Sequence, residues 1–175
     1  SDGDDAIYSI DIDLAGNIYV AGGTTSDTLQ YSLSDLPNDS MGGQASGFVA
    51  KINPSGSTPL ATCMFGTELY DQVFFVKVND QDSVYIAGTT KALNNELIVN
   101  ADYANNNGGQ FIAQLNTNLD DIIWSTQFGV DNGKPDLSLT AFSIGLNHNL
   151  YISGWGIEAI SASPIIWAQI QGIKD

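Results

Sequence analysis

Three aspartates recur along the chain at nearly the same interval. Asp5, Asp71 and Asp136 are separated by 66 and 65 residues. If the units that carry them surround one axis, their carboxylates form a ring of oxygen ligands that suits a hard cation such as Ca²⁺. Alternatively, each aspartate caps its own connection by accepting backbone N–H bonds, which leaves no room for an ion. The sequence supports both a calcium site and a capping role for these residues.

The residues that enzymes use for nucleophilic or zinc-assisted catalysis are scarce. His148 is the only histidine and Cys63 the only cysteine, so neither a triad nor a zinc site is expected. A glycosidase needs two carboxylates beside one bond, but Glu68, Glu96 and Glu158 do not follow the interval of the aspartates. We expect no enzymatic activity and, calcium apart, no cofactor; a glycoside hydrolase is kept as an alternative.

The segment Asp11-Ile-Asp-Leu-Ala-Gly-Asn17 has the glycine of an EF-hand calcium loop at its sixth position. Its fifth position is Ala15, however, and no glutamate closes the loop. A hairpin turn held by side-chain to backbone hydrogen bonds explains this pattern better. His148 falls in a similar predicted turn, where we expect a solvated side chain.

Two long polar segments, 26–46 and 91–109, are candidates for a ligand site. Loops of this length are usually functional or mobile. Together with a later strand they carry aromatic and amide side chains of the kind that binds a sugar or a protein. The candidate ligand residues are Tyr31, Tyr103, Asn105, Asn106, Asn107 and Trp155. In the alternative interpretation the loops are solvated, and their aromatic side chains pack onto the strands.

Charge and composition exclude several classes of protein. The chain has 175 residues, with 20 acidic residues, 5 lysines, no arginine and a formal net charge of −15. A surface that tracks phosphates needs clustered basic residues, so binding to nucleic acid or to an anionic membrane surface is not expected. Apolar residues make up 43% of the chain, which is enough for a core. Because no long apolar run occurs, membrane insertion is not expected either.

A repeat of 66 residues organises the chain. Asn17-Ile-Tyr-Val-Ala-Gly22 returns as Ser83-Val-Tyr-Ile-Ala-Gly88 and as Asn149-Leu-Tyr-Ile-Ser-Gly154. Alternating polar and apolar residues, separated by turns rich in Gly and Asn, predict strands. The predicted strands are 6–13, 18–25, 47–53 and 59–65 in the first repeat, 71–79, 83–90, 110–117 and 121–128 in the second, and 138–146, 149–155 and 164–171 in the third.

Four antiparallel strands in each repeat are typical of β-propeller blades. The sequence therefore predicts an all-β segment of one β-propeller domain. Its blades are 1–66, 67–129 and an incomplete third blade at 130–175. A β-sandwich with accidental sequence similarity is the alternative. Because stacked repeats bury their faces against one another, we expect the rest of a larger protein or neighbouring chains to complete the ring.

Two blocks of the first repeat resemble a known family. Gly-Asn-Ile-Tyr-Val-Ala-Gly-Gly-Thr-Thr at 16–25 and Gly-Phe-Val-Ala-Lys-Ile-Asn-Pro-Ser-Gly-Ser at 47–57 are similar to the SBBP, or seven-bladed β-propeller, repeat. The resemblance covers nearly the whole chain. It is weakest in the third repeat, where Trp155 replaces the threonine of the first block.

The resemblance implies a location and a role. SBBP repeats are found in large secreted or surface-anchored proteins of Bacteroidetes-type bacteria, which implies an extracellular or cell-surface location. The role it implies is a non-enzymatic scaffold or an adhesion module that binds a protein or a glycan. A carbohydrate-binding propeller is an alternative function. The resemblance does not identify the ligand.

Overall fold

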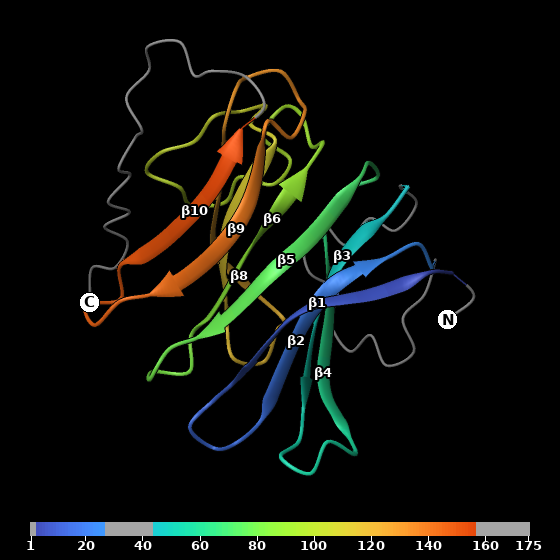
Figure 1. Ribbon diagram of the computed structural model, residues 1–175, viewed down its shortest axis with the longest axis vertical. Coiled ribbons are helices and arrows are strands. Elements are labelled where there is room, and N and C mark those ends of the chain that lie inside the picture. Colours follow the sequence, from blue (N-terminus) through green and yellow to red (C-terminus); the bar gives the residue numbers. More distant parts are fainter. Residues whose placement is uncertain (1–2, 27–43, 157–175) are drawn as a thin grey trace.

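The computed structural model describes residues 3–26 and 44–156, which form strands and turns without a helix. Along this part of the chain (Figure 1) the strands are β1 (Asp5–Ile12), β2 (Ile18–Thr24), β3 (Ser46–Ile52), β4 (Pro59–Phe65), β5 (Asp71–Val78), β6 (Val84–Thr90), β7 (Gln110–Leu115), β8 (Ile122–Phe128), β9 (Leu137–Ile144) and β10 (Leu150–Gly156). Every bound lies within two residues of the predicted one. The strand predicted at 164–171 and the candidate residue Tyr31 lie outside the described residues.

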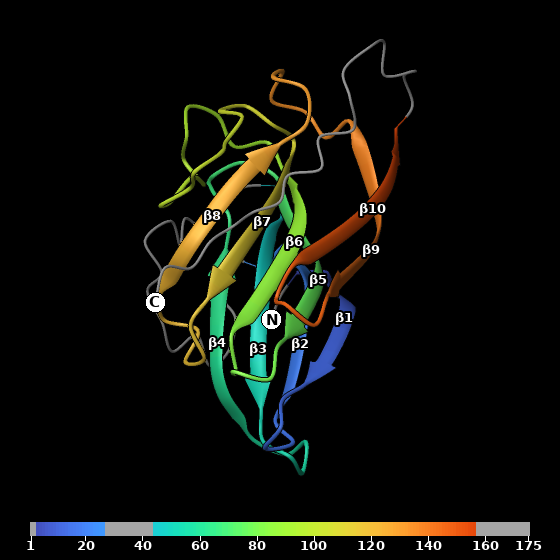
Figure 2. The same ribbon diagram turned by 90° about the vertical axis from the view of Figure 1, so that its left-hand side faces the viewer.

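Three antiparallel sheets contain these strands in the order of the sequence. Sheet 1 has the order β1-β2-β3-β4 and sheet 2 the order β5-β6-β7-β8, while sheet 3 pairs β9 with β10 in the described part of the chain. Figure 2 shows the first strands β1, β5 and β9 on one side of the molecule and the fourth strands β4 and β8 on the other. The fold is all-β, and the equivalent residues Tyr19, Tyr85 and Tyr151 lie on the second strands of three different sheets.

Equivalent turns connect the first two strands of each sheet. Gly16, Asp82 and His148 occupy the same turn position, with positive φ values of 83°, 60° and 57°. This left-handed conformation costs a residue with a Cβ atom about 1–2 kcal/mol. In sheet 1, Asp13 closes the turn by accepting two bonds of 2.8 Å, from the Asn17 backbone N–H and from its side-chain amide. The prediction of a hairpin turn at 11–17 is confirmed.

Each first strand also has a β-bulge at the same repeat position. The pairing register shifts at Tyr8 in β1, at Phe74 in β5 and at Thr140 in β9. A bulge twists its strand and redirects the side chain of the extra residue. The rings of Tyr8 and Phe74 consequently meet between sheets 1 and 2, with centroids 5.4 Å apart and an interplanar angle of 67°.

Every sheet has two unlike faces, because side chains alternate along its strands. The tyrosine face carries the equivalent residues Tyr19, Tyr85 and Tyr151. The aliphatic face carries the residues that follow them, Val20, Ile86 and Ile152. The tyrosine face of sheet 1 packs on the aliphatic face of sheet 2, and the tyrosine face of sheet 2 packs on the aliphatic face of sheet 3.

Equivalent residues are therefore buried or exposed according to whether a neighbouring sheet covers them. Tyr19 and Tyr85 are 0% and 2% exposed, whereas Tyr151 is 54% exposed. On the aliphatic faces sheet 1, not sheet 3, has the exposed residue: Ile10 is 60% exposed, whereas its equivalent Val76 in sheet 2 is fully buried.

Among the described residues, no sheet covers the aliphatic face of sheet 1 or the tyrosine face of sheet 3. Val20, Phe48 and Met64 on that aliphatic face are nevertheless buried in a cluster of their own, so its exposure is greatest along β1, at Ile10 and Ile12.

Candidate functional site

Asp5 and Asp71 belong to equivalent hydrogen-bond networks at the starts of β1 and β5. Asp71 is fully buried and accepts bonds from the Thr67 backbone N–H at 2.6 Å and the Thr67 hydroxyl at 2.9 Å. It also accepts the Thr90 hydroxyl at 2.5 Å. Asp5 likewise accepts the hydroxyl of Thr24, which is the equivalent of Thr90. Each carboxylate thus ties the first strand of a sheet to the end of its second strand.

The burial of Asp71 affects its ionisation. Burial raises the pKa of the Asp71 carboxyl, while hydrogen bonds from Thr90 and Thr67 lower it by a smaller amount. The carboxyl is therefore harder to ionise than an aspartate in water, because the low-dielectric interior disfavours the charged form.

Asp136 departs from this arrangement. Its Oδ2 atom accepts the Val130 backbone N–H at 3.1 Å, but its buried Oδ1 atom has no donor among the described residues. The physical reason is that Asp136 lies one residue before β9, where Leu137 pairs with Gly156 at the register position at which Asp5 pairs with Thr24 and Asp71 with Thr90. Gly156 has no hydroxyl to donate.

The capping role predicted for the repeated aspartates is present at Asp71 and Asp136, which both accept a backbone N–H. In residues 3–26 and 44–156, no three His, Cys, Asp or Glu side chains form a group that could hold a metal ion. Calcium coordination by Asp5, Asp71 and Asp136 depends on further repeats that complete a ring, and it stays a prediction.

Two of the candidate ligand residues hold the loop between β6 and β7 against the connection from β8 to β9. The side-chain amide of Asn105 donates to the Gly129 carbonyl at 2.6 Å, and that of Asn107 donates to the Asp131 carboxylate at 2.6 Å. Asn107 also accepts the Asn94 backbone N–H at 3.2 Å. Each amide therefore uses one of its two N–H donors within the protein, and ligand binding by these residues stays a prediction.

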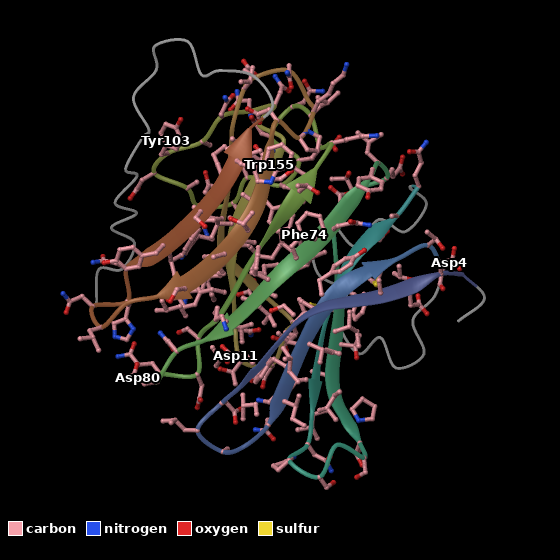
Figure 3. The ribbon with its side chains drawn as sticks, in the orientation of Figure 1. Asp4, Asp11, Phe74, Asp80, Tyr103 and Trp155 are labelled. Atoms are coloured by element: carbon pink, nitrogen blue, oxygen red, sulfur yellow. The ribbon has the colours of Figure 1, made fainter. Side chains whose placement is uncertain are left out.

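The other described candidates are open to solvent. Tyr103 is 46% exposed and Trp155 is 58% exposed, and Asn106 is exposed as well. Figure 3 shows Tyr103 on the loop after β6 and Trp155 near the end of β10, both in the upper part of the view. Tyr103 and Trp155 therefore come from different sheets but lie toward the same end of the molecule. They retain the exposed aromatic surface that a ligand site needs.

His148 has a contact that sequence reasoning did not anticipate. Its Nδ1 atom lies 3.1 Å from the Asn79 amide nitrogen and 3.8 Å from the Asp80 carboxylate, both in the turn of sheet 2. His148 occupies the predicted turn, but its side chain is only partly solvated, because the turn of sheet 3 packs on the turn of sheet 2. Cys63 is fully buried in the interface between sheets 1 and 2.

Sequence reasoning also missed a hollow of about 530 Å³ beside the first strands of the three sheets. We call it the aromatic notch and define it by the lining residues Tyr8, Tyr70, Phe74, Thr89, Asp136 and Ser138. Two of its aromatic rings occupy the bulge positions 8 and 74, and this 66-residue interval is the signal that could have revealed it.

Two sequence comparisons found no relative of this chain. No protein-family model matches the chain, and no curated protein matches its sequence. In the described part of the chain, no helix has the length and apolar character needed to cross a membrane.

Proposed function

We propose that this chain is part of a β-propeller that serves as a non-enzymatic scaffold or adhesion module. The observation that supports the proposal is the repeated use of one interface, in which a tyrosine face packs on an aliphatic face. An interface between two unlike faces can be extended by one sheet after another, and it closes into a ring when the rotation between sheets allows. Four-stranded antiparallel sheets stacked on one another are typical of propeller blades, which supports the proposal.

Aromatic contacts recur at both interfaces. Phe65 of sheet 1 meets Phe111 of sheet 2 with ring centroids 4.8 Å apart, and Phe75 of sheet 2 meets Phe142 of sheet 3 at 6.4 Å. Such contacts add to the hydrophobic stabilisation of the buried faces. Rigid stacking of this kind suits a scaffold, because each sheet is held by its neighbours.

Exposed apolar side chains on the outer faces of sheets 1 and 3 indicate the partner. Ile10 and Ile12 are 60% and 58% exposed on sheet 1, and Tyr151 is 54% exposed on sheet 3. Their equivalents in sheet 2 are covered by a neighbouring sheet. We infer that further sheets of the same repeat, from the rest of a larger protein or from neighbouring chains, cover these two faces.

The resemblance of two blocks to SBBP repeats supports an extracellular or cell-surface location in a Bacteroidetes-type bacterium. The net charge of −15 is compatible with that location, since a strongly charged surface keeps a protein soluble. A carbohydrate-binding propeller is the second candidate function. The exposed rings of Tyr103 and Trp155 favour it.

Sedimentation velocity of the 175-residue chain over a range of concentrations tests the proposal. We expect association that increases with concentration, and we expect Ile10→Lys to weaken it because a charge then lies on the aliphatic face of sheet 1. Leu146→Lys is the matched control, since Leu146 is a fully exposed turn residue of sheet 3. A chain that stays monomeric at every concentration and melts cooperatively at high temperature would contradict the proposal.

A further inference from the structure

We propose that the aromatic notch binds a neutral carbohydrate of one or two sugar rings. This inference specifies the ligand class of the adhesion role proposed above. It depends only on described residues of the three sheets and does not require a closed ring.

The notch has the size and the position of a ligand site. Its volume of about 530 Å³ falls in the range of roughly 300–1,000 Å³ that is usual for small-molecule sites. Tyr8 comes from β1, Phe74 from β5 and Ser138 from β9, so the site needs all three sheets. Figure 3 shows Phe74 on β5, the strand that contacts both β1 and β9.

The aromatic rings supply surface for the C–H groups of a sugar. Tyr8 is 46% exposed and meets Phe74 edge to face at 5.4 Å. In an edge-to-face pair one ring directs its edge at its partner, so the faces of that ring stay uncovered by the partner. The negative face of an aromatic ring attracts the weakly positive C–H groups of another molecule. The bulges at positions 8 and 74 bring these two rings together.

A few polar groups surround the rings and can orient a polyol. The hydroxyls of Thr89 and Ser138 and the carboxylate of Asp136 line the notch. Hydroxyls donate and accept hydrogen bonds, and a carboxylate accepts them, which matches the mixed hydrogen-bonding groups of a sugar. An apolar wall with few polar groups is the usual composition of a small-molecule site.

The charges around the notch favour a neutral ligand. Asp136 on the wall and the net charge of −15 repel an anionic sugar. The Lys91 ammonium lies 5.1 Å from the ring centroid of Tyr70, so it occupies one face of that ring. The same negative charges attract a cation, whereas Lys91 repels it close to the aromatic surface. A neutral sugar meets neither repulsion, and choline is the probe that decides between a neutral and a cationic ligand.

Saturation-transfer NMR on the full chain tests the inference with a defined panel of probes. The neutral probes are the methyl glycosides of glucose, galactose, mannose and N-acetylglucosamine, together with cellobiose and lactose. The charged probes are N-acetylneuraminic acid and choline. We expect at least one neutral probe to bind and the charged probes to bind more weakly or not at all.

Variants assign binding to the notch. Tyr8→Ala should weaken the affinity about tenfold, because it removes one aromatic contact. Tyr151→Ala is the matched control, since Tyr151 is 54% exposed, close to the 46% of Tyr8, and lies outside the notch. Ser138→Phe changes an exposed residue and should block binding by filling the hollow. Thermal melts show whether each variant remains folded, and Ser138→Phe decides the assignment if Tyr8→Ala does not fold.

Three results overturn the inference: no neutral probe binds, a charged probe binds best, or Tyr151→Ala weakens binding as much as Tyr8→Ala. A chain that associates but binds no sugar overturns this inference and leaves the scaffold proposal intact. A chain that binds sugar in the notch but stays monomeric supports this inference and contradicts the scaffold proposal.

Discussion

Ser9 of sheet 1 forms hydrogen bonds in both directions with the backbone of Val76 in sheet 2. Its hydroxyl accepts the Val76 N–H at 3.1 Å and donates to the Val76 carbonyl at 3.4 Å. Asp11, which lies two residues further along β1, accepts the Val78 N–H at 2.9 Å. Its carboxylate also lies 3.8 Å from the Lys77 ammonium. Because β5 is an edge strand of sheet 2, its outward backbone groups have no strand partner. Side chains of sheet 1 satisfy them and protect the edge from pairing with other chains.

Removing these side chains should destabilise the chain. Ser9→Ala and Asp11→Ala each leave backbone groups of β5 without a partner, so we expect each to lower the free energy of unfolding by about 1–3 kcal/mol. Urea denaturation followed by circular dichroism measures the change. Ser143→Ala is the control, because Ser143 is the exposed equivalent of Asp11 in sheet 3. A loss from Ser143→Ala equal to that from Ser9→Ala would contradict the edge-protecting role.

The repeated turn position should respond in opposite directions to two substitutions. Asp82 has a φ of 60°, and its Oδ1 atom is buried without a donor among the described residues. Asp82→Gly removes the strain of the positive φ and the buried oxygen that lacks a donor. We expect it to raise the free energy of unfolding by about 1 kcal/mol. Gly16→Ala introduces a Cβ atom at a φ of 83° and should lower it by about 1 kcal/mol. Urea melts of both variants check the pair, and a destabilising Asp82→Gly would show that its carboxylate matters more than its backbone.

Stability should depend on pH through Asp71. Its pKa is raised by burial above the ordinary value of 3.8, so the folded state holds this proton at pH values where the unfolded state has lost it. The free energy of unfolding therefore falls as the pH rises from about 3.8 through the raised pKa. Asp71→Asn cannot titrate and should lack this component. Urea melts from acidic to neutral pH, compared between the two proteins, measure the difference, and parallel pH profiles would show that Asp71 does not contribute.

The strands and turns could be predicted because their signals are local. Alternation of side chains defined the strand bounds to within two residues, and the turn at 11–17 followed from the hydrogen-bonding capacity of Asp13. Equivalent residues such as Tyr19 and Tyr85 were assigned correctly to second strands of separate sheets. These properties depend on residues that are close together in the sequence.

The candidate site was only partly predictable, because the role of a polar side chain depends on what lies beside it in space. Asn105 and Asn107 are expected to bind a ligand, which stays a prediction, and the structure adds that each side chain bonds an acceptor 24 residues away. His148 was expected in a turn, and its contact with Asn79 spans 69 residues. No local pattern reports such partners.

The sequence by itself determined the repeat and the alternation of side chains that gives each strand two faces. Only the tertiary structure decided which faces are covered. Tyr19 and Tyr151 occupy the same repeat position, yet one is fully buried and the other is 54% exposed. The difference arises because burial depends on the neighbouring sheet. For the same reason the aromatic notch emerged only when β1, β5 and β9 came together, since Tyr8 and Asp136 are brought to one hollow by the packing of three sheets.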